Sequence, residues 1–377
     1  MMKKHLLPIL VCSAVTLGSV AGARADALPS RPVLSITRQA EQMIQIDCVA
    51  SPARLYLLQT TTDLLNPDWA NVTTAVPNAA GLFSWSGFLP KTEPTRFYRL
   101  AALGPVGGGL LARNQILFAG RPSLDSYDSA SPSLASGPFY SASKRNDHAL
   151  AMAGSHDPGA ISVNNGHIYG RASTGPGGTI LCGKGAVGDL LWNVDDFGVQ
   201  PGHADHNASV SLQDNSLPSP WLASTPGAGT FEGQDYAYLL GTGNYELPSL
   251  NLAGGEAMAV SGNAILHVAG DFTSGGTSFV YIAPGATLRL YIGGKLAASG
   301  KGLINAGGRP SACSIFGLPT CTAITFDGTS AFYGVVDAPQ ATLTFSGTTD
   351  ASGSFIADNI VLNGNVGVHY DESLAGE

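Results

Sequence analysis

The sequence contains few charged residues, and this limits the partners that the protein can have. Charged side chains make up 12% of the 377 residues, with 19 Lys and Arg against 27 Asp and Glu, and the formal net charge is −8. An acidic, weakly charged chain lacks the basic surface that binds nucleic acid or an anionic membrane. No stretch after the first 25 residues approaches the roughly 18 apolar residues needed to cross a bilayer. We therefore expect no nucleic-acid partner and no membrane span in the mature protein.

The sequence also lacks contiguous catalytic motifs. It contains no G-x-S-x-G nucleophile elbow and no H-E-x-x-H zinc motif. Residues 183–188, GKGAVG, fit the dinucleotide pattern G-x-G-x-x-G. The following DLLWNVDDFG is too short and too rich in turns for the helix that this fingerprint requires, and 48 glycines make a chance match expected. These absences lower the odds of a hydrolase, and no catalytic residue is predicted.

The N-terminal segment MMKKHLLPILVCSAVTLGSVAGARA predicts a secretory signal peptide over residues 1–25. A basic start, an apolar core and a small-x-small tripeptide before the cleavage point are typical of this signal. Its removal takes three of the 19 basic residues and no acid, which leaves 16 against 27 and a net charge of −11. We expect the mature chain to be secreted, either extracellular, at the cell surface or in the periplasm.

Four cysteines remain after this cleavage, namely Cys48, Cys182, Cys313 and Cys321. In an oxidising compartment we predict a disulfide between Cys313 and Cys321, because Gly317 and Pro319 allow the loop between them to fold back. The alternative is that all four are free buried thiols. The sequence does not decide whether Cys48 and Cys182 are paired, and no spacing resembles a zinc site.

Short alternating segments separated by turn residues fill the chain up to residue 103, and they predict a small β-sandwich over residues 26–103. The phrases YLLQTTTDL, DWANV, FSW and RFYRL resemble the fibronectin type III-like modules that precede other domains in secreted bacterial proteins. This resemblance implies that Trp69 and Trp85 lie in or near the core and that residues 96–99 form the last strand. Residues 104–118, which begin GPVGGGLLA, are predicted to be a Gly-rich linker and an initial strand.

From residue 119 onward, apolar residues alternate in bursts of four to seven that end at Gly or Asn-Gly, which indicates short strands. Similar phrases recur: GNAILHV, GATLRLY and QATLTFS place Ala264, Ala286 and Ala341 at apparently matching corners. A period near 20 is typical of a solenoid of stacked parallel strands. We predict an all-β protein in which residues 119–377 form a right-handed parallel β-helix with an irregular excursion at about 195–245. A β-sandwich of hairpins is the alternative.

Several segments of this half resemble a known family. SLDSYDSASP, IYGRASTGPGG, FYGVVDAP and NGNVGVHYDESL are similar to an uncharacterised family of exported bacterial β-helical domains. Some members follow pilin-like or adhesin-like segments, and they share a distant likeness to polymer-forming bactofilins. The resemblance spans roughly residues 119–374. It implies the fold and a surface location, and because the family has no established activity it implies no site.

The densest polar group in the sequence is a candidate cation site. It comprises Asp195, Asp196, His203, Asp205 and His206. Carboxylate oxygens suit calcium and imidazoles suit a transition metal, so we expect no cofactor unless this group binds calcium. The alternative is a solvated acidic loop.

Aromatic residues in the excursion are candidates for carbohydrate binding, namely Trp221, Tyr236, Tyr238 and Tyr245. Residues 369–372, HYDE, are predicted to cap the open end of the solenoid rather than to form an acid–base set. Asp125 and Asp128 are predicted to bond their own backbone in a turn.

The sequence favours a secreted or cell-surface structural or adhesive protein without catalytic activity. An extracellular polysaccharide or a surface protein is the expected partner. The alternative is a carbohydrate-active β-helix enzyme or a carbohydrate-binding protein. The strands carry few Lys or Arg to abstract a proton, which weighs against a polysaccharide lyase.

Overall fold

The computed structural model describes residues 33–39, 43–50, 54–63, 70–78, 81–88, 96–105, 108–130, 139–208, 210–328 and 331–375. The chain divides into two compact units, one ending at Leu103 and also taking in Ser211–Gln213, the other comprising the rest from Gly104 onward. The predicted signal peptide and Trp69 lie outside the described residues. Within the described residues, no helix has the length and apolar character needed to span a bilayer.

The first unit contains two sheets around one core. An antiparallel sheet has the order β1-β2-β5, and a second sheet has the order β17-β4-β3-β6. Their bounds are β1 Val33–Arg38, β2 Met43–Val49, β3 Arg54–Thr61, β4 Ala70–Val76, β5 Leu82–Phe88, β6 Phe97–Pro105 and β17 Val210–Leu212. Alternate residues such as Ile46 on β2, Leu58 on β3 and Tyr98 on β6 share the core, with Trp85 packed against it. The unit is therefore a small β-sandwich, and β17 reaches it from a distant part of the chain.

The second unit is a stack of parallel strands built from two runs of the chain. The first run contains β7 Gly109–Ala112, β8 Ile116–Gly120, β9 Ser123–Tyr127, η1 Ala142–Lys144, β10 Ala149–Ala153, β11 Ile161–Asn164, β12 His167–Thr174, β13 Ile180–Cys182, β14 Ala186–Gly188, α1 Trp192–Asp195, β15 Gly198–Val199 and β16 Ala204–Asp205. Its strands pair in parallel, for example β7 with β10 and β10 with β12.

The second run begins with the antiparallel hairpin β18 Gly227–Phe231 and β19 Gln234–Leu240. It continues with β20 Gly243–Leu247, β21 Leu250–Leu252, β22 Ala257–Val260, β23 Asn263–Val268, β24 Phe272–Ser274, β25 Phe279–Ile282, β26 Thr287–Ile292, β27 Leu296–Gly300, β28 Gly302–Asn305, η2 Pro310–Ala312, β29 Cys313–Gly317, β30 Ala323–Gly328, β31 Phe332–Gly347, β32 Asp350–Gly364, β33 Gly367–Asp371 and η3 Glu372–Ala375.

Each rung of the second run, meaning one circuit of the chain around the stack, lies directly on the next. Ala264 of β23 lies opposite Leu288 of β26, and Leu288 lies opposite Cys313 of β29. On the same strands Leu266 and Leu290 are opposite each other and fully buried. Because successive side chains of a strand point to opposite faces, the alternating pattern buries one row inside and leaves the next row outside.

The repeated phrase does not mark equivalent positions, so that part of the prediction is wrong. Leu288 lies on β26 in the row of Ala264, whereas Leu343 lies on β31 opposite Ile324 of β30. Both leucines are buried. The phrase recurs because every strand of the stack needs the same alternation after its corner, with Thr outside and Leu inside. This holds for strands on any side of the stack.

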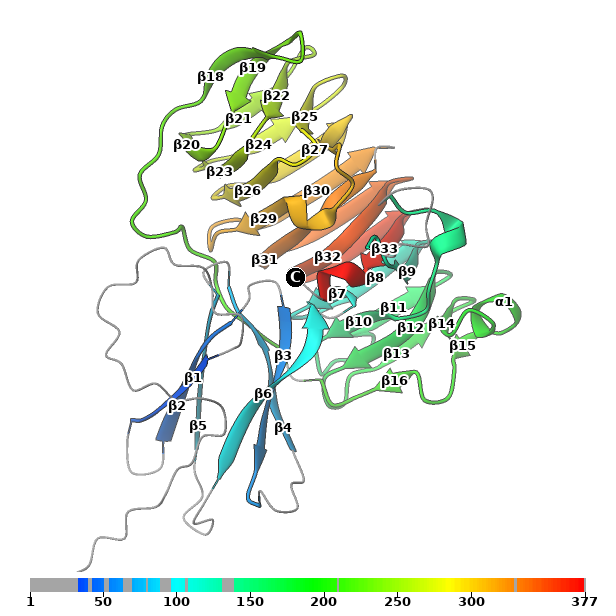
Figure 1. The fold of residues 1–377 in the computed structure, drawn as a ribbon. Helices are drawn as coiled ribbons and strands as arrows, with labels where there is room; N and C mark the ends of the chain where they lie inside the picture. Colours follow the sequence, from blue (N-terminus) through cyan, green and yellow to red (C-terminus); the bar gives the residue numbers. More distant parts are fainter. Residues whose placement is uncertain are drawn as a thin grey trace, which may run out of the picture. The chain divides into compact units, whose positions relative to one another are not determined.

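The two runs meet out of sequence order (Figure 1). The last strands of the second run pair with the first strands of the first run: β32 pairs with β7 and β8, and β33 pairs with β9. Phe355 lies opposite Leu110 and Ile360 opposite Ile116, in the same parallel manner as any other rung. We call this junction the seam. The ends of the stack are therefore formed by β13–β16 and β18–β21, and both lie in the interior of the sequence.

The stack bears on two predicted segments. Residues 104–118, predicted to be a Gly-rich linker and an initial strand, contribute the buried strand β7 and the beginning of β8 to the stack. The predicted excursion at 195–245 contains strands that belong to the stack, among them β16, β19 and β20. The true connection between the runs is residues 206–226, and it includes β17.

Glycines close the strands at one corner because that corner requires a left-handed backbone. Gly347 has φ 82° and Gly364 has φ 101°, and the two lie opposite each other on β31 and β32. A Cβ at Gly364 would lie 2.5 Å from the carbonyl oxygen of Gly347. The Gly that ends each burst in the sequence therefore serves both the turn and the close stacking of the rungs.

Candidate functional site: a buried polar cluster at the seam

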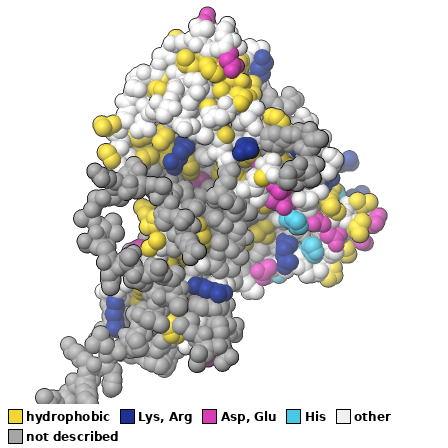
Figure 2. All heavy atoms as spheres, viewed as in Figure 1, with side chains coloured by type: hydrophobic (Ala, Val, Ile, Leu, Met, Phe, Trp, Pro, Cys, Tyr) yellow, Lys and Arg dark blue, Asp and Glu magenta, His cyan; other side chains and the backbone are white. Residues whose placement is uncertain are grey.

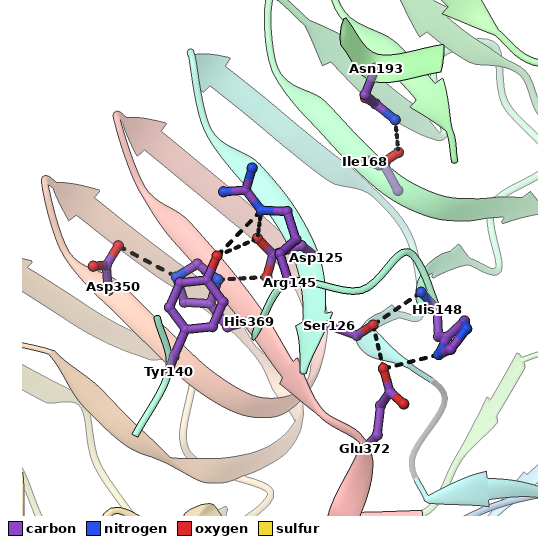
Figure 3. A network of polar contacts seen from close by, with 10 residues as sticks. All are labelled: Asp125, Ser126, Tyr140, Arg145, His148, Ile168, Asn193, Asp350, His369 and Glu372. Atoms are coloured by element: carbon purple, nitrogen blue, oxygen red, sulfur yellow. Dashed lines mark hydrogen bonds and ion pairs between the residues drawn. The ribbon is translucent and has the colours of Figure 1, made fainter. Parts of the chain in front are cut away.

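The most extensive group of polar side chains described in the second unit lies at the seam, on its outer face (Figure 3). Asp125 on β9 and His369 on β33 lie opposite each other in the parallel pairing of these strands. Asp350 begins the neighbouring β32. Residues 139–148, which include η1, lie over these strands and bring Tyr140 and Arg145 to them. We call these five residues the seam cluster.

Asp125 is the centre of the seam cluster. Its Oδ1 lies 2.7 Å from Nδ1 of His369. Its Oδ2 accepts hydrogen bonds from the Tyr140 hydroxyl at 2.8 Å and from Nε of Arg145 at 2.7 Å. The Tyr140 and His369 rings stack with centroids 3.4 Å apart and planes 10° apart. Asp125 is 0% exposed, so one buried carboxylate serves donors from two separate parts of the chain.

Burial and charge act on His369 in opposite directions. Burial of the imidazole lowers its pKa, but its contacts with Asp125 and Asp350 outweigh burial, and the pKa is raised above the ordinary value. Nε2 of His369 lies 3.6 Å from Oδ1 of Asp350, which is an ion-pair distance rather than a hydrogen bond. Burial also raises the pKa of the Tyr140 hydroxyl, and the Asp125 charge adds to this shift. The protonated imidazole is thus stabilised between two carboxylates.

A second group lies beside the seam cluster. Oε1 of Glu372 is 2.7 Å from Oγ of Ser126, 2.9 Å from Nδ2 of Asn146 and 3.1 Å from Nδ1 of His148. Burial raises the pKa of Glu372, but hydrogen bonds from Asn146, Ser126 and His148 outweigh it, so its pKa is lowered. This carboxylate ties the end of the chain to the first run.

The seam places the residue types of a catalytic triad on three adjacent strands. Ser352 of β32 lies opposite His369, which lies opposite Asp125. The geometry does not match the chemistry, because the second nitrogen of the imidazole faces the Asp350 carboxylate and the ring is covered by Tyr140. His369 is 3% exposed and Ser352 is buried as well. The arrangement joins strands, and its serine and histidine are both buried.

The structure does not gather the predicted cation ligands. Among the residues that it describes, no group of three or more His, Cys, Asp or Glu side chains could hold a metal ion. His203 bonds the carbonyl oxygen of Gly170 at 2.7 Å, and His206 lies 3.0 Å from that of Gly178. Asp195, Asp196 and Asp205 are exposed. These residues are close in sequence but do not form a metal site, because the imidazoles of His203 and His206 contact backbone carbonyl oxygens instead.

The four predicted carbohydrate-binding aromatics do not form one surface. Trp221 donates from Nε1 to Oε2 of Glu246 at 2.9 Å on the outer side of β20, whereas the neighbouring Tyr245 packs against the core. Tyr238 also packs against the core. Tyr236 is buried and its ring meets that of Phe279 edge-on.

The predicted disulfide is wrong, since Cys313 and Cys321 are free buried thiols. Cys313 begins β29, and Gly317 ends it. Four steps along a strand span about 13 Å. A Cβ at Gly317 would lie 3.4 Å from that of Cys321, so Cys321 sits at the far end of the strand from Cys313, beyond the reach of a disulfide. Cys48 and Cys182 are also free.

Sequence reasoning named both halves of the seam cluster without connecting them. Asp128 does bond local backbone, accepting from the amide of Ala130 at 2.8 Å, as predicted. Asp125 does not, because its partner is His369, 244 positions away. The usable signal was polar residues at alternate positions of short strands, which places Asp125 and His369 on one face of β9 and β33.

Comparison with known proteins identifies one family model. Residues 223–377 match a family described as a domain of unknown function (DUF7305). The match covers the second run of strands and does not extend to the first run. No curated protein and no solved structure matches the chain.

Proposed function

We propose that the protein is a secreted or cell-surface structural or adhesive protein without catalytic activity. The observation that carries the proposal is the seam cluster: its central carboxylate and imidazole are 0% and 3% exposed and are bonded to each other. A catalytic acid or base must reach its substrate, within hydrogen-bonding distance or through one water. Groups that are enclosed and bonded to each other instead hold two parts of a chain together.

The architecture supports the same proposal. Rungs of similar length with continuous buried rows support a parallel β-helix, and the general handedness of parallel crossovers favours the right-handed form. The two-sheet first unit supports a fibronectin type III-like module. A solenoid of this kind extends in one dimension and suits the display or spacing of surfaces. The resemblance to exported domains that accompany pilin-like or adhesin-like segments points the same way.

An extracellular polysaccharide or a surface protein is the proposed partner class. Among the described residues the carbohydrate-active alternative finds less support, because the four candidate aromatics do not share one surface. It is nevertheless simple to test in the same experiment.

The test is a panel of acidic and neutral polysaccharides incubated with the mature protein. Retention on each polysaccharide and release of reducing ends are measured together. Binding without cleavage, or neither, agrees with the proposal. Release of reducing ends that scales with protein concentration overturns it, and loss of that release in His369→Gln would place the chemistry at the seam after all.

A further inference from the structure

We infer that the loop around α1, residues 189–198, is a docking knob for another protein that offers an apolar pocket with a basic rim. We call this loop the α1 knob. The inference rests on the proposed function, because it names a contact surface for a non-catalytic surface protein.

The α1 knob exposes large apolar side chains to solvent. Leu191 and Val194 are each 77% exposed and Phe197 is 70% exposed. Figure 2 shows hydrophobic and acidic side chains together at the margin of the view where Figure 1 places α1. Single exposed apolar residues are ordinary on a protein surface, but a contiguous group marks an interaction site.

Hydrogen bonds fix the base of the α1 knob to the stack, so its apolar side chains are exposed on an ordered loop. The buried Asn193 donates from Nδ2 to the carbonyl oxygen of Ile168 at 3.1 Å (Figure 3). The same Nδ2 donates to the carbonyl oxygens of Gly188 at 2.9 Å and Asp189 at 3.0 Å. Nδ1 of His167, on β12, lies 3.2 Å from Oδ1 of Asn193. This amide therefore fastens α1 to the stack.

A second set of bonds closes the loop on itself. Asp189 accepts from the amide of Trp192 at 2.8 Å and from Nε2 of Gln200 at 2.8 Å, and its own amide donates to Oε1 of Gln200 at 2.7 Å. Nε1 of Trp192 donates to the carbonyl oxygen of Gly198 at 3.3 Å. These hydrogen bonds, led by the Trp192 amide, lower the pKa of the Asp189 carboxyl. A loop ordered before binding loses little conformational entropy in the complex.

Charge decides what kind of partner fits. Asp195 and Asp196 are exposed and lie between Val194 and Phe197 in the sequence, and the α1 knob itself contains no Lys or Arg. Carboxylates at this position are repelled by an anionic lipid surface. Two knobs packed against each other would bring four carboxylates together, which disfavours a second copy. An apolar pocket rimmed by Lys or Arg matches both the apolar tip and the acidic flank.

The probe is a synthetic amphipathic helical peptide with Leu on one face and Lys on both flanks of that face. A control peptide carries Glu in place of Lys. The mature full-length protein is titrated into each labelled peptide, and fluorescence anisotropy gives the affinity. We expect saturable binding of the Lys peptide and binding of the Glu peptide at least about tenfold weaker, a difference of roughly 1.4 kcal/mol.

The variants separate the knob from general acidity. Leu191→Ser with Val194→Ser keeps every charge and should weaken the Lys peptide at least about tenfold, as for residues central to an interface. Leu222→Ser is the matched control, because Leu222 is 79% exposed but lies outside the knob, and it should bind as the unmodified protein does. Circular dichroism confirms that each variant is folded.

Several outcomes would overturn the inference. These are equal binding of the two peptides, no effect of the double variant, knob-dependent dimers in sedimentation velocity, and knob-dependent binding to lipid vesicles. Cleavage in the polysaccharide panel would overturn the proposed function while leaving these measurements intact, so the two failures can be told apart.

Discussion

Asp125→Ala should destabilise the protein far more than loss of an exposed carboxylate. The substitution leaves the His369 imidazolium, the Arg145 guanidinium and the Tyr140 hydroxyl without their common acceptor. The aspartate is 0% exposed, so water cannot replace it without opening the seam. Removing one partner of a buried ion pair costs about 3–5 kcal/mol. Urea unfolding followed by circular dichroism measures this as a lower midpoint with an unchanged slope.

Asp358→Ala is the control for this measurement. Asp358 lies 3.8 Å from the guanidinium of Arg113, and both side chains are partly exposed. Exposed pairs of this kind contribute roughly 0–1 kcal/mol. If Asp125→Ala costs no more than Asp358→Ala, the seam cluster does not hold the two runs together, and the reasoning that assigns it a structural role is refuted.

Three further predictions concern pH, packing and backbone. Because the folded-state pKa of His369 is raised, its contribution to stability is complete below its ordinary pKa, about 6.5, and is lost as pH rises through the folded value. Urea midpoints should therefore fall as pH rises above the ordinary pKa of about 6.5, and the fall should be smaller in His369→Gln; an equal decline in both proteins would assign the effect to other groups. Leu343→Ala should cost about 2–5 kcal/mol and Thr342→Ala well under 1, since these neighbours face inward and outward; the reverse order in denaturant midpoints would mean that the strand register is wrong. Gly347→Ala should cost at least about 1 kcal/mol, because φ is 82° and a Cβ would lie 2.8 Å from a carbonyl oxygen of the neighbouring rung. Gly307→Ala, where a Cβ meets only ordinary contacts, should leave the thermal midpoint nearly unchanged, and equal shifts would contradict this account.

Local features of the fold could be predicted from the sequence. Alternation in segments such as β26 and β31 indicated strands with one buried face, and the Gly after each burst indicated corners. These signals depend on side-chain direction and on backbone conformation, which neighbouring residues set. The two-sheet first unit could be predicted for the same reason.

The order of the rungs could not be predicted, because it depends on which edges meet in space. Phe355 pairs with Leu110, and the alternation around each residue is like that of any other rung. A parallel ladder offers every following strand the same hydrogen bonds, so local pattern does not distinguish a rung next in sequence from one far away. The repeat alone therefore predicts rungs that stack in the order of the sequence.

The same reason explains what was missed in the site. The predicted cation ligands Asp195 and His203 are close in sequence, yet His203 contacts the carbonyl oxygen of Gly170 and Asp195 is exposed. Asp125 and His369 are far apart in sequence and form a buried polar contact across the seam. Buried polar groups form hydrogen bonds with whatever partner the fold brings near them. Here the partner is set by the pairing of β9 with β33, which the local sequence does not show.

The position of the seam in the sequence has a consequence for the time course of folding. During synthesis the edges of β7, β8 and β9 are complete early, but the strands that cover them are β32 and β33, the last of the chain. Such distant pairings are formed late, because the entropy of closing the loop opposes them until the rest is in place. Until then these edges present unpaired backbone groups to any other strand nearby. The interval between synthesis of the first run and synthesis of β33 is therefore the period in which these strand edges are most exposed to wrong pairing.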